Sequence, residues 1–434
     1  MEPEPPLHVL PYAPPVLAGT SAVEARHWRD LTSEQKKTGL AAWLGWFFDG
    51  LDMHLYTLVA APFVAHLLGV LESDPRVKEK AGFIQAAFLI GWAIGGAFFG
   101  RLGDLIGRSK SLSLTIITYA AFTGASFFVT TWWQLLITRF IAALGIGGEW
   151  AVGSSLLSET WPKKWRPWIA AVLQTGVNLG VIAAFGVAFA FAGHEKKYVF
   201  LVGISPALLV YWIRKAVPEP AEWHEAKTGA PPPSVSELFR GATCKITILT
   251  MLVCASSLTA WWAFMFWINQ HWKHLPVVKD WTKQHQEQFG TSMFGGIIGI
   301  SIAGNFFAGW LAKQIGYRRA ISLLTFSMFI SVYLGFRIPR GHLDLMPYVL
   351  ATGFFSGVFG LFTMYLPPLF PTLLRTTGAG FCYNIGRIAA AIGTIIFGLK
   401  STNGDLRPAL LVVGFLFIPA TVIAWFMPDH EAIS

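Results

Sequence analysis

The sequence predicts an all-α membrane protein with twelve transmembrane helices in two pseudo-symmetric bundles of six. The 434 residues are 54% hydrophobic and only 13% charged, whereas about a quarter of a soluble domain is charged. The apolar residues fall in runs of about 20, the length that spans a bilayer core. An internal repeat at an offset of about 209 residues indicates two related halves.

The apolar runs form two groups of six, separated by a polar segment. They lie at about 39–68, 82–100, 111–130, 132–155, 168–192, 198–214, 244–269, 291–312, 319–337, 346–369, 377–398 and 407–427. The expected organisation is a cytoplasmic N-terminal tail (1–38), a first bundle (39–216), a cytoplasmic linker (217–243), a second bundle (244–428) and a cytoplasmic C-terminal tail (429–434).

The repeat is clearest in two pairs of segments. Residues 100–110 (Gly-Arg-Leu-Gly-Asp-Leu-Ile-Gly-Arg-Ser-Lys) return in weaker form at 309–319. Residues 161–166 (Trp-Pro-Lys-Lys-Trp-Arg) return at 370–375 as Phe-Pro-Thr-Leu-Leu-Arg. Repeated halves are how many secondary transporters are built, so the repeat favours a transporter.

The lysine and arginine residues predict the orientation in the membrane. With an even number of spans both ends lie on one side, and the loops of that side carry the excess of Lys and Arg, which favours cytoplasmic termini. The first 38 residues are rich in Pro and lack the apolar core of a signal peptide. We expect a multi-pass protein of the plasma membrane, in bacteria the inner membrane. The net charge of +9 is spread over many short loops, which argues against nucleic-acid binding.

The segment between the second and third runs carries a specific motif. It reads Gly100-x-Leu-x-Asp104-x-x-Gly107-Arg108-x-Lys110. This resembles the signature loop of the major facilitator superfamily, and the resemblance covers nearly the whole chain. It implies two six-helix bundles, a central site, and rocking between inward-open and outward-open states.

Other motifs are similar to particular branches of that superfamily. Arg139, Glu159, Arg166 and 218–223 (Pro-Glu-Pro-Ala-Glu-Trp) look like the sugar-porter-related part. Asp49-Gly-Leu-Asp52 resembles the Asp-Gly-Phe-Asp motif of the aromatic-acid proton symporters. The metabolite and sialate proton symporters are resembled by 145–150 (Gly-Ile-Gly-Gly-Glu-Trp), 370–372 (Phe-Pro-Thr) and 383–387 (Tyr-Asn-Ile-Gly-Arg). The branch therefore stays open.

The charged residues of the motif loops can form a gate between the halves. Asp104 can accept hydrogen bonds from the N–H groups of a helix N-terminus and pair with Arg108 or Arg166. Glu159 can pair with Arg166 or Arg101. Such contacts exist only when the cytoplasmic ends are closed, so they favour the outward-open state. The alternative is a loop that only fixes topology.

The expected gate is asymmetric. Lys313 stands at the counterpart of Asp104 in the second half, and Pro368 at the counterpart of Glu159. The acids of the first half must therefore keep the gate closed. The glycines of the 100–110 segment permit a tight turn and close helix approach. The complete set of gate candidates is Gly100, Asp104, Gly107, Arg108, Glu159, Arg166 and Arg375.

Ionisable residues inside the spans are functional candidates, because hydrocarbon makes each charge costly. Asp49 and Asp52 lie three apart on one helix face, and in a dry cavity two neighbouring acids favour a proton on one of them. A proton-coupled carrier needs such a group. The alternative is that both acids pair with Arg139, which should lie at the depth of Asp52. Glu149 is a candidate for the proton path or for a cytoplasmic polar cluster.

Arg387 is the candidate anchor for a substrate carboxylate. Arginine stays charged and its fork suits carboxylates. The alternative is a charge held by the first span or by backbone carbonyls. Asn384 and Tyr383 precede Arg387 by three and four residues, so they share or flank its face. Asn178 is the counterpart of Arg387 in the first half, and both should lie near the membrane midplane, facing each other across the two halves.

Further polar and aromatic residues are candidates for the cavity wall. Gln174 and Asn178 form an i, i+4 pair that lines the cavity or joins helices. The aromatic pair Trp261 and Trp262 can stack on an aromatic or apolar substrate, although Trp is also common at membrane interfaces. The complete set of substrate-binding candidates is Arg387, Asn178, Gln174, Asn384, Tyr383, Trp261, Trp262, Asn305 and Tyr365.

These observations favour a transporter over an enzyme. The sequence has no pattern of metal ligands, no phosphate-binding loop and no nucleophile elbow, so no cofactor is expected beyond the proton. Its three cysteines lie in apolar runs as packing residues. The prediction is a monomeric, proton-coupled symporter of a small organic acid: a monocarboxylate, a sialate or an aromatic acid. A neutral sugar or polyol porter, a proton-antiport exporter of drugs or metabolites and a non-transporting nutrient receptor remain alternatives.

Overall fold

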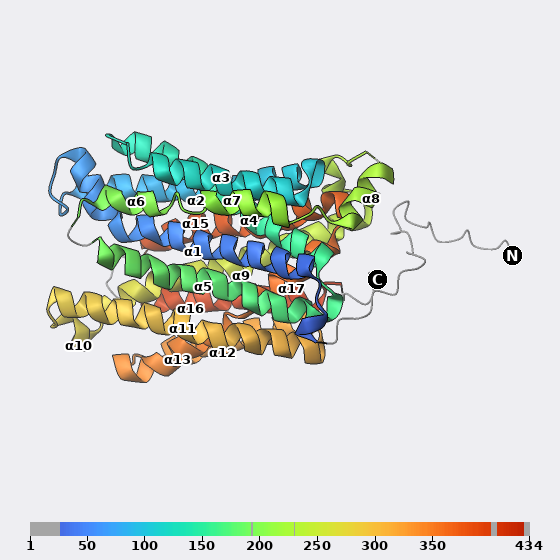
Figure 1. Cartoon of the computed structure of the whole chain (residues 1–434). Helices are drawn as coiled ribbons and strands as arrows, with labels where there is room; N and C mark the ends of the chain where they lie inside the picture. Colours follow the sequence, from blue (N-terminus) through green and yellow to red (C-terminus); the bar gives the residue numbers. More distant parts are fainter. Residues whose placement is uncertain (1–26, 192–193, 230, 401–405, 429–434) are drawn as a thin grey trace.

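The computed structural model describes residues 27–191, 194–229, 231–400 and 406–428. These residues form a bundle of long helices that run side by side (Figure 1). Within these ranges, ten helical stretches are long and apolar enough to cross a membrane. Helices α3 (Arg108–Ala125) and α15 (Arg375–Lys400) supply the other two crossings. The predicted all-α architecture with twelve transmembrane helices is therefore confirmed.

The remaining helices follow the predicted order. In the first half they are α1 (Ser33–Leu68), α2 (Pro75–Ile106), α4 (Trp132–Thr160), α5 (Arg166–Ala190), α6 (Val199–Val202) and α7 (Ala207–Ala216), followed by the connecting α8 (Ala221–Gly229). In the second half they are α9 (Gly241–His274), α10 (Pro276–Lys279), α11 (Lys283–Ile315), α12 (Tyr317–Phe336), α13 (His342–Phe355), α14 (Val358–Tyr365), α16 (Arg407–Phe415) and α17 (Phe417–Trp425). Short 3-10 turns are η1 (Trp28–Asp30), η2 (Lys163–Trp165), η3 (Lys196–Tyr198), η4 (Val235–Phe239), η5 (Pro367–Leu369) and η6 (Thr372–Leu374).

Three predicted spans are interrupted rather than continuous. The break between α6 and α7 contains Pro206, and Pro419 follows the break between α16 and α17 by three residues. Proline lacks the N–H that a helix needs and clashes with the carbonyl four residues earlier. The break between α13 and α14 contains Gly357, whose backbone approaches Gly304 of α11 so closely that a Cβ would not fit. These breaks bend the spans without ending them.

The two halves meet along two seams. Helix α2 packs against α15, and α5 packs against α11. On α2 a Cβ added at Gly100 would lie 2.7 Å from the carbonyl oxygen of Thr376, and one added at Gly96 would collide with Asn384. Gly95, on another face of α2, has no room for a Cβ because the backbone of Leu144 on α4 is in contact. Glycine therefore lets α2 lie close to both halves at once.

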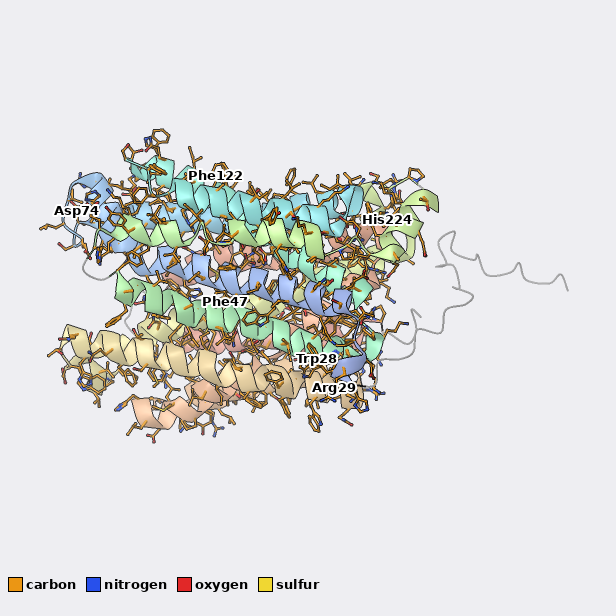
Figure 2. All side chains as sticks on the ribbon, in the orientation of Figure 1. Trp28, Arg29, Phe47, Asp74, Phe122 and His224 are labelled. Atoms are coloured by element: carbon orange, nitrogen blue, oxygen red, sulfur yellow. The ribbon has the colours of Figure 1, made fainter. Side chains whose placement is uncertain are left out.

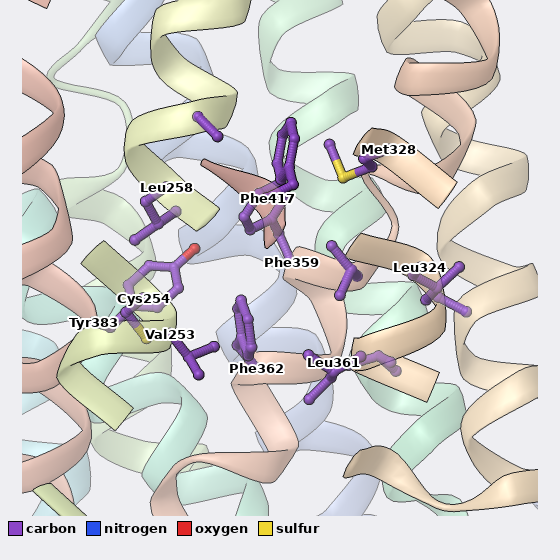
Figure 3. Close-up of a cluster of buried hydrophobic side chains, with 14 of the residues drawn as sticks. Val253, Cys254, Leu258, Leu324, Met328, Phe359, Leu361, Phe362, Tyr383 and Phe417 are labelled. Atoms are coloured by element: carbon purple, nitrogen blue, oxygen red, sulfur yellow. The ribbon is translucent and has the colours of Figure 1, made fainter. Parts of the chain in front are cut away.

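The second half has a continuous apolar core around α9, α12 and α14. Figure 3 shows Leu258 of α9, Met328 of α12 and Phe362 of α14 in this cluster. All three are buried, and Tyr383 of α15 belongs to the same cluster. Since lipid is as apolar as these side chains, close packing rather than exclusion from water holds such helices together. Tyr383 therefore packs against this cluster on one side.

The flanks of the bundle are apolar and its ends are polar. Figure 2 places Asp74 at one end, Arg29 and His224 at the other, and Phe47 and Phe122 along the flank. Many large apolar side chains of the flank are exposed, as expected for a surface that faces lipid. We call the end that carries α8 and the turn between α2 and α3 the α8 end (Figure 1).

Candidate functional site

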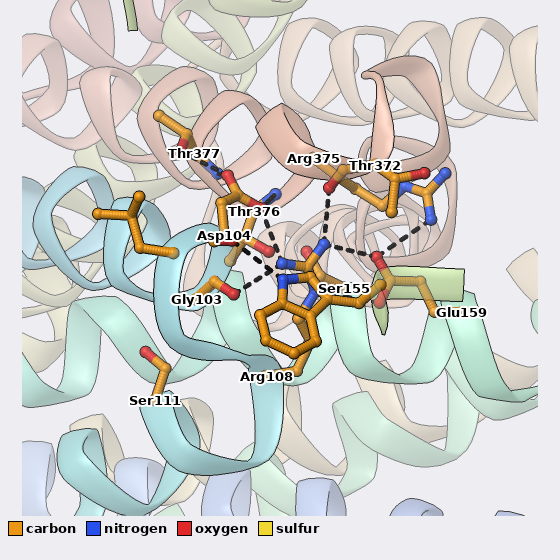
Figure 4. A network of polar contacts seen from close by, with 12 residues as sticks. Gly103, Asp104, Arg108, Ser111, Ser155, Glu159, Thr372, Arg375, Thr376 and Thr377 are labelled. Carbon is orange, nitrogen blue, oxygen red and sulfur yellow. Dashed lines mark hydrogen bonds and ion pairs between the residues drawn. The ribbon is translucent and has the colours of Figure 1, made fainter. Parts of the chain in front are cut away.

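A buried network of charged residues closes the α8 end, and we call it the clasp. Arg108 is its centre and is completely buried. Its guanidinium donates to Asp104 Oδ1 at 2.9 Å, to Glu159 Oε1 and Oε2 at 2.8 and 3.0 Å, and to the carbonyl oxygens of Gly103 and Thr372 at 2.7 Å each (Figure 4). The clasp consists of Asp104, Arg108, Glu159, Thr372, Arg375, Thr376 and Thr377.

Asp104 caps a helix of the opposite half. Its carboxylate accepts the N–H groups of Thr376 at 3.2 Å and Thr377 at 2.8 Å, and the Thr377 hydroxyl at 2.5 Å. These N–H groups belong to the first turn of α15, where an anion is favoured. The structure thus has both predicted contacts of Asp104, the helix N-terminus and Arg108, and the cap joins the two halves.

The predicted partners of Glu159 are wrong. Glu159 pairs with Arg108 and with Arg375 Nη1 at 3.1 Å, not with Arg166 or Arg101. It reaches across the seam to α15, whereas Arg166 donates to the carbonyl oxygen of Ser158 on its own half. All four arginines lie on other helices than Glu159, so the choice among them depends on tertiary packing that sequence spacing does not give.

The connecting helix α8 and the residues before it fasten the clasp from outside. Glu219 accepts the N–H groups of Ser109 at 3.1 Å and Lys110 at 3.0 Å, so it caps α3. Gly107, with φ of 111°, forms the turn that allows this approach, because a Cβ there would touch the Glu219 carboxyl. Glu222 pairs with Arg375 of the second half at 2.8 Å. The linker therefore binds both halves.

We expect Asp104→Asn to open the clasp. An amide cannot accept as many N–H bonds, and each lost hydrogen bond to a charged group costs about 1.5–3 kcal/mol, so the clasp-open population should rise roughly tenfold or more. The test is the rate at which a thiol reagent labels Ser155→Cys, a buried clasp-side position on α4, in a background without native cysteines. Asp74→Asn is the matched control, because Asp74 caps α2 at the opposite end. Equal labelling in the two variants would contradict a gating role.

Arg387 lies deep in the bundle. It lies eleven positions beyond Thr376 along α15, so it sits about 17 Å from the clasp, near the middle of a bilayer core. It is 5% exposed. Its guanidinium donates to Asn384 Oδ1, while its Nε has no hydrogen-bond partner among the described residues. Within the described ranges no carboxylate forms an ion pair with it. The guanidinium is thus held in place with part of its donor capacity unused.

Asp52 and Arg139 neutralise each other, which is the alternative that the sequence left open for both acids and that the structure shows for Asp52 alone. Arg139 Nη2 lies 2.9 Å from Asp52 Oδ2 and Nη1 lies 3.3 Å from Oδ1. The guanidinium also donates to the Thr123 hydroxyl at 3.1 Å and lies over the rings of Phe88 and Tyr56, at 5.0 and 5.4 Å. This forked, stacked geometry makes Asp52 a fixed counter-ion.

Asp49 points to a different neighbour, Glu149. The two carboxyl groups are adjacent, and both Glu149 oxygens and Asp49 Oδ1 are buried without a hydrogen-bond donor among the described residues. Tyr119 is the other polar neighbour of Glu149, and Gly45 leaves the space that its carboxyl occupies. Glu149 therefore lies in the interior, not in a polar cluster at the α8 end. Asp49 is also within electrostatic range of Arg387.

The other polar candidates are divided. Asn178 donates to Ser301 Oγ at 2.7 Å and to the Ile298 carbonyl at 3.3 Å, so it joins α5 to α11, which is the alternative role. Asn178 contacts neither Arg387 nor the residues that contact Arg387. The sequence predicted that Asn178 and Arg387 face each other across the two halves, and the structure shows no contact between them. Gln174 lies beside Gly360 at the seam of α5 and α14, where a Cβ on Gly360 would be 3.5 Å away.

Two further candidates have clear positions. Asn305 is buried on α11, and its Nδ2 has no partner among the described residues. Tyr365 is not a cavity residue, because its hydroxyl donates to the Pro428 carbonyl at 2.6 Å and its ring stacks on Tyr317 at the α8 end. It packs α14 against the end of α17. The sequence made Tyr365 a candidate only as a polar residue within an apolar run.

Aromatic side chains surround Arg387, and only part of them was predicted. Tyr383 lies 4.9 Å from its guanidinium. Trp262 lies 6.1 Å from Trp92, whereas Trp261 contacts Phe359 in the core of the second half. Trp92 and Trp150 were missed as site residues. Trp150 follows Glu149 directly in the glycine-rich motif, which was an available signal, but Trp92 has no sequence signal that distinguishes it from other membrane tryptophans.

The site offers ion pairs and hydrogen bonds rather than metal ligands. Across the residues that the structure describes, no three His, Cys, Asp or Glu side chains cluster as a metal site. Cys254 and Cys382 are buried thiols, and Cys382 lies 3.7 Å from the carbonyl oxygen of Thr247. The arrangement can bind an anion at Arg387 and hold a proton at Asp49 and Glu149.

Known proteins resemble this chain over most of its length. The sialic acid transporter NanX of Escherichia coli K12 is 29% identical, over 90% of this chain and 93% of that protein. The cis,cis-muconate transport protein of Acinetobacter baylyi is 25% identical, over 90% and 94%. Among solved structures, the proton:xylose symporter XylE superposes with a TM-score of 0.73 at 17% identity, covering 92% of this chain and 96% of that one. This last likeness shows the fold.

The family model described as Major Facilitator Superfamily matches residues 42–332, which is more than half of the chain. The match agrees with the two helical halves, the clasp at the signature loop and the buried charges at mid-depth. The chain is therefore a multi-pass membrane transporter, not an enzyme. It belongs to the major facilitator superfamily.

Proposed function

We propose that the protein is a proton-coupled symporter that imports a small organic acid by alternating access. The observation that carries the proposal is Arg387, a guanidinium that is buried at mid-depth, has no carboxylate partner in the described part of the chain and keeps an unused donor. Burying an unpaired charge costs several kcal/mol or more, so such a residue is retained for a function. A substrate carboxylate is the partner that its fork fits best.

The adjacent acids support proton coupling. Two ionised carboxylates cannot lie side by side in a site without water or cations, so Asp49 and Glu149 hold at least one proton between them. Asp52 is occupied by Arg139, which leaves the proton to the Asp49–Glu149 pair. Because Asp49 is close enough to Arg387 to influence it, ionisation of the pair competes with the substrate for the guanidinium. Protonation therefore strengthens substrate binding.

The relatives support an acid as substrate. Sialic acid and cis,cis-muconate, the compounds in the names of the two transporters described above, are both carboxylic acids. The sugar symporters among the solved structures share the fold at 16–18% identity, which carries no information on substrate. A buried arginine facing a neutral sugar would keep its charge uncompensated, which favours the acid.

The proposed setting is a monomer in the bacterial inner membrane, with the α8 end in the cytoplasm. The clasp then seals the cytoplasmic side, and its opening releases substrate inward. The α8 end carries basic residues, including Lys110, Lys227 and Arg319. The positive-inside rule assigns an end with such residues to the cytoplasm. Both termini lie on this side in the proposal.

The proposal is tested by uptake into proteoliposomes with an imposed pH gradient. Lactate, benzoate, sialate and glucose are offered as radiolabelled substrates. We expect gradient-driven accumulation of one or more acids and none of glucose. Asp49→Asn should lose accumulation against the gradient but keep exchange of internal for external substrate. The neutral asparagine imitates the protonated acid, so Arg387 still binds the substrate, but the asparagine cannot release a proton.

Glu79→Gln is the matched control for Asp49→Asn, since Glu79 is an exposed acid of α2 with a neighbouring lysine. It should behave as wild type. Accumulation of glucose without uptake of any acid would overturn the proposal. If the double variant Asp49→Asn with Glu149→Gln accumulated the acid like wild type, acid transport would stand, but the Asp49–Glu149 pair would not be the proton site.

A further inference from the structure

Aromatic rings from four helices converge on Arg387. Its guanidinium lies 3.9 Å from the Trp92 ring of α2 and 4.9 Å from the Tyr383 ring of α15. Tyr383 stacks on Trp150 of α4 with centroids 3.8 Å apart and an angle of 5° between planes, and Trp92 contacts Trp262 of α9 edge to face at 6.1 Å. The anion anchor is thus enclosed by flat π surfaces.

Two donors in this cluster have no partner in the described part of the chain. They are Nε of Arg387 and the indole Nε1 of Trp92. Both side chains are more than nine-tenths buried, at 5% and 7% exposure, and the Trp92 ring is in contact with the guanidinium. Other buried donors of the described residues, such as those of Trp46 and Arg375, also lack a partner, and this pair is set apart because its two side chains are in contact beside the unpaired charge of Arg387, where a ligand acceptor is favoured. One carboxylate can accept from both.

The ring contacts also cross between the two halves. Trp92 and Trp150 belong to the first half, whereas Tyr383, Arg387 and Trp262 belong to the second. A movement of one half against the other therefore separates Trp150 from Tyr383. When the parallel rings of Trp150 and Tyr383 move apart, a flat ring fits between them more readily than a puckered one. A flat ring keeps full contact with both ring faces.

We propose that the site selects a planar aromatic or conjugated monocarboxylate, with its carboxylate on Arg387 and Trp92 and its π system against Tyr383 and Trp150. This inference rests on the proposed organic-acid transport and narrows its substrate. Trp92 and Trp150 act as specificity-determining residues. Rings that merely pack the two halves together would give no preference between flat and puckered acids of equal size.

The decisive comparison is benzoate against cyclohexanecarboxylate. Both are monoanions at neutral pH with a six-membered carbon ring, and they differ in planarity and π character. Equilibrium binding of each to the purified protein in detergent requires no proton gradient. Since each aromatic contact contributes roughly 0.5–1.5 kcal/mol, two contacts should make benzoate bind about tenfold more tightly. This comparison in wild type does not depend on any variant being able to fold.

Two variants separate the roles of the rings. Trp150→Leu removes one of the two stacking faces, so we expect the preference for benzoate to fall from about tenfold to about threefold, because benzoate is weakened more than cyclohexanecarboxylate. Trp92→Phe keeps a ring and removes the N–H, so it should weaken both acids by a similar factor, about tenfold, and leave the preference intact. Trp133→Leu, a 51% exposed tryptophan on the same helix as Trp150, is the control and should change neither.

The outcomes distinguish this inference from the proposed function. A preference of about tenfold that falls to about threefold in Trp150→Leu supports both. Equal binding of the two acids, or tighter binding of cyclohexanecarboxylate, would overturn the selection of planar acids, while gradient-driven uptake of either acid would leave the proposed symport standing. Binding of neither acid, with accumulation of glucose in proteoliposomes, would overturn both.

Discussion

Replacing Arg387 by alanine should abolish uptake of the acid while the protein still inserts and folds. Loss of a buried, hydrogen-bonded charge partner costs about 2–5 kcal/mol of binding free energy, which is roughly 30-fold to several thousandfold in Kd. The Asp49–Glu149 pair loses its positive neighbour in the variant, and a second proton on the pair keeps the interior neutral, so the protein still folds. The measurements are substrate binding in detergent and initial uptake rates in proteoliposomes.

Two matched variants make this result specific. Arg387→Lys keeps the charge but loses the planar fork and its stacking on Trp92, so it should restore little of the binding. Arg340→Ala removes an arginine that also stacks on an aromatic ring, 4.7 Å from Tyr348, but lies outside the site. It should transport normally. Wild-type uptake in Arg387→Ala would remove Arg387 as the anchor.

The ion pair of Asp52 and Arg139 should give the largest effect on stability. Asp52→Ala leaves a completely buried guanidinium without its counter-ion, and breaking a buried pair in this way costs about 3–5 kcal/mol. The double variant Asp52→Ala with Arg139→Leu removes both charges and should recover most of the loss. Unfolding by SDS, followed through tryptophan fluorescence, measures the difference.

An exposed ion pair provides the reference for that experiment. Glu237 and Arg240 lie 2.9 Å apart with side chains 41% and 70% exposed. Removing one member of such a pair changes stability by about 0–1 kcal/mol. If Asp52→Ala were no more destabilising than Glu237→Ala, or if the double variant were as unstable as Asp52→Ala alone, the pair would have no structural role.

The spans could be predicted from the sequence because the length of an apolar run fixes whether it crosses a bilayer. The breaks could not, since Pro206 and Gly357 hardly change the apolarity of a run. Pairing at similar depth was predictable for Asp52 and Arg139, because helix rise converts residue number into depth. The rotation of each helix about its own axis has no such simple signal.

The candidate site was predictable in its charges and not in its contacts. Hydrocarbon makes every buried charge conspicuous, so Asp49, Glu149 and Arg387 were found. That Glu149 meets Asp49 depends on the packing of α1 against α4, where Gly45 leaves room. The ring of Trp92 reaches Arg387 only because glycines let α2 lie against α15. Such distances follow from tertiary structure.

The neighbourhood of Arg387 and the Asp49–Glu149 pair has an electrical consequence for the proposed cycle. With one proton shared by the acids, the empty site has one positive and one negative charge and is neutral. Loading a monoanion together with a second proton leaves it neutral again. The anion alone, or the proton alone, would leave a net charge inside the membrane, which hydrocarbon disfavours. Only the empty and the fully loaded carrier can then reorient, and the membrane voltage does no work on either step.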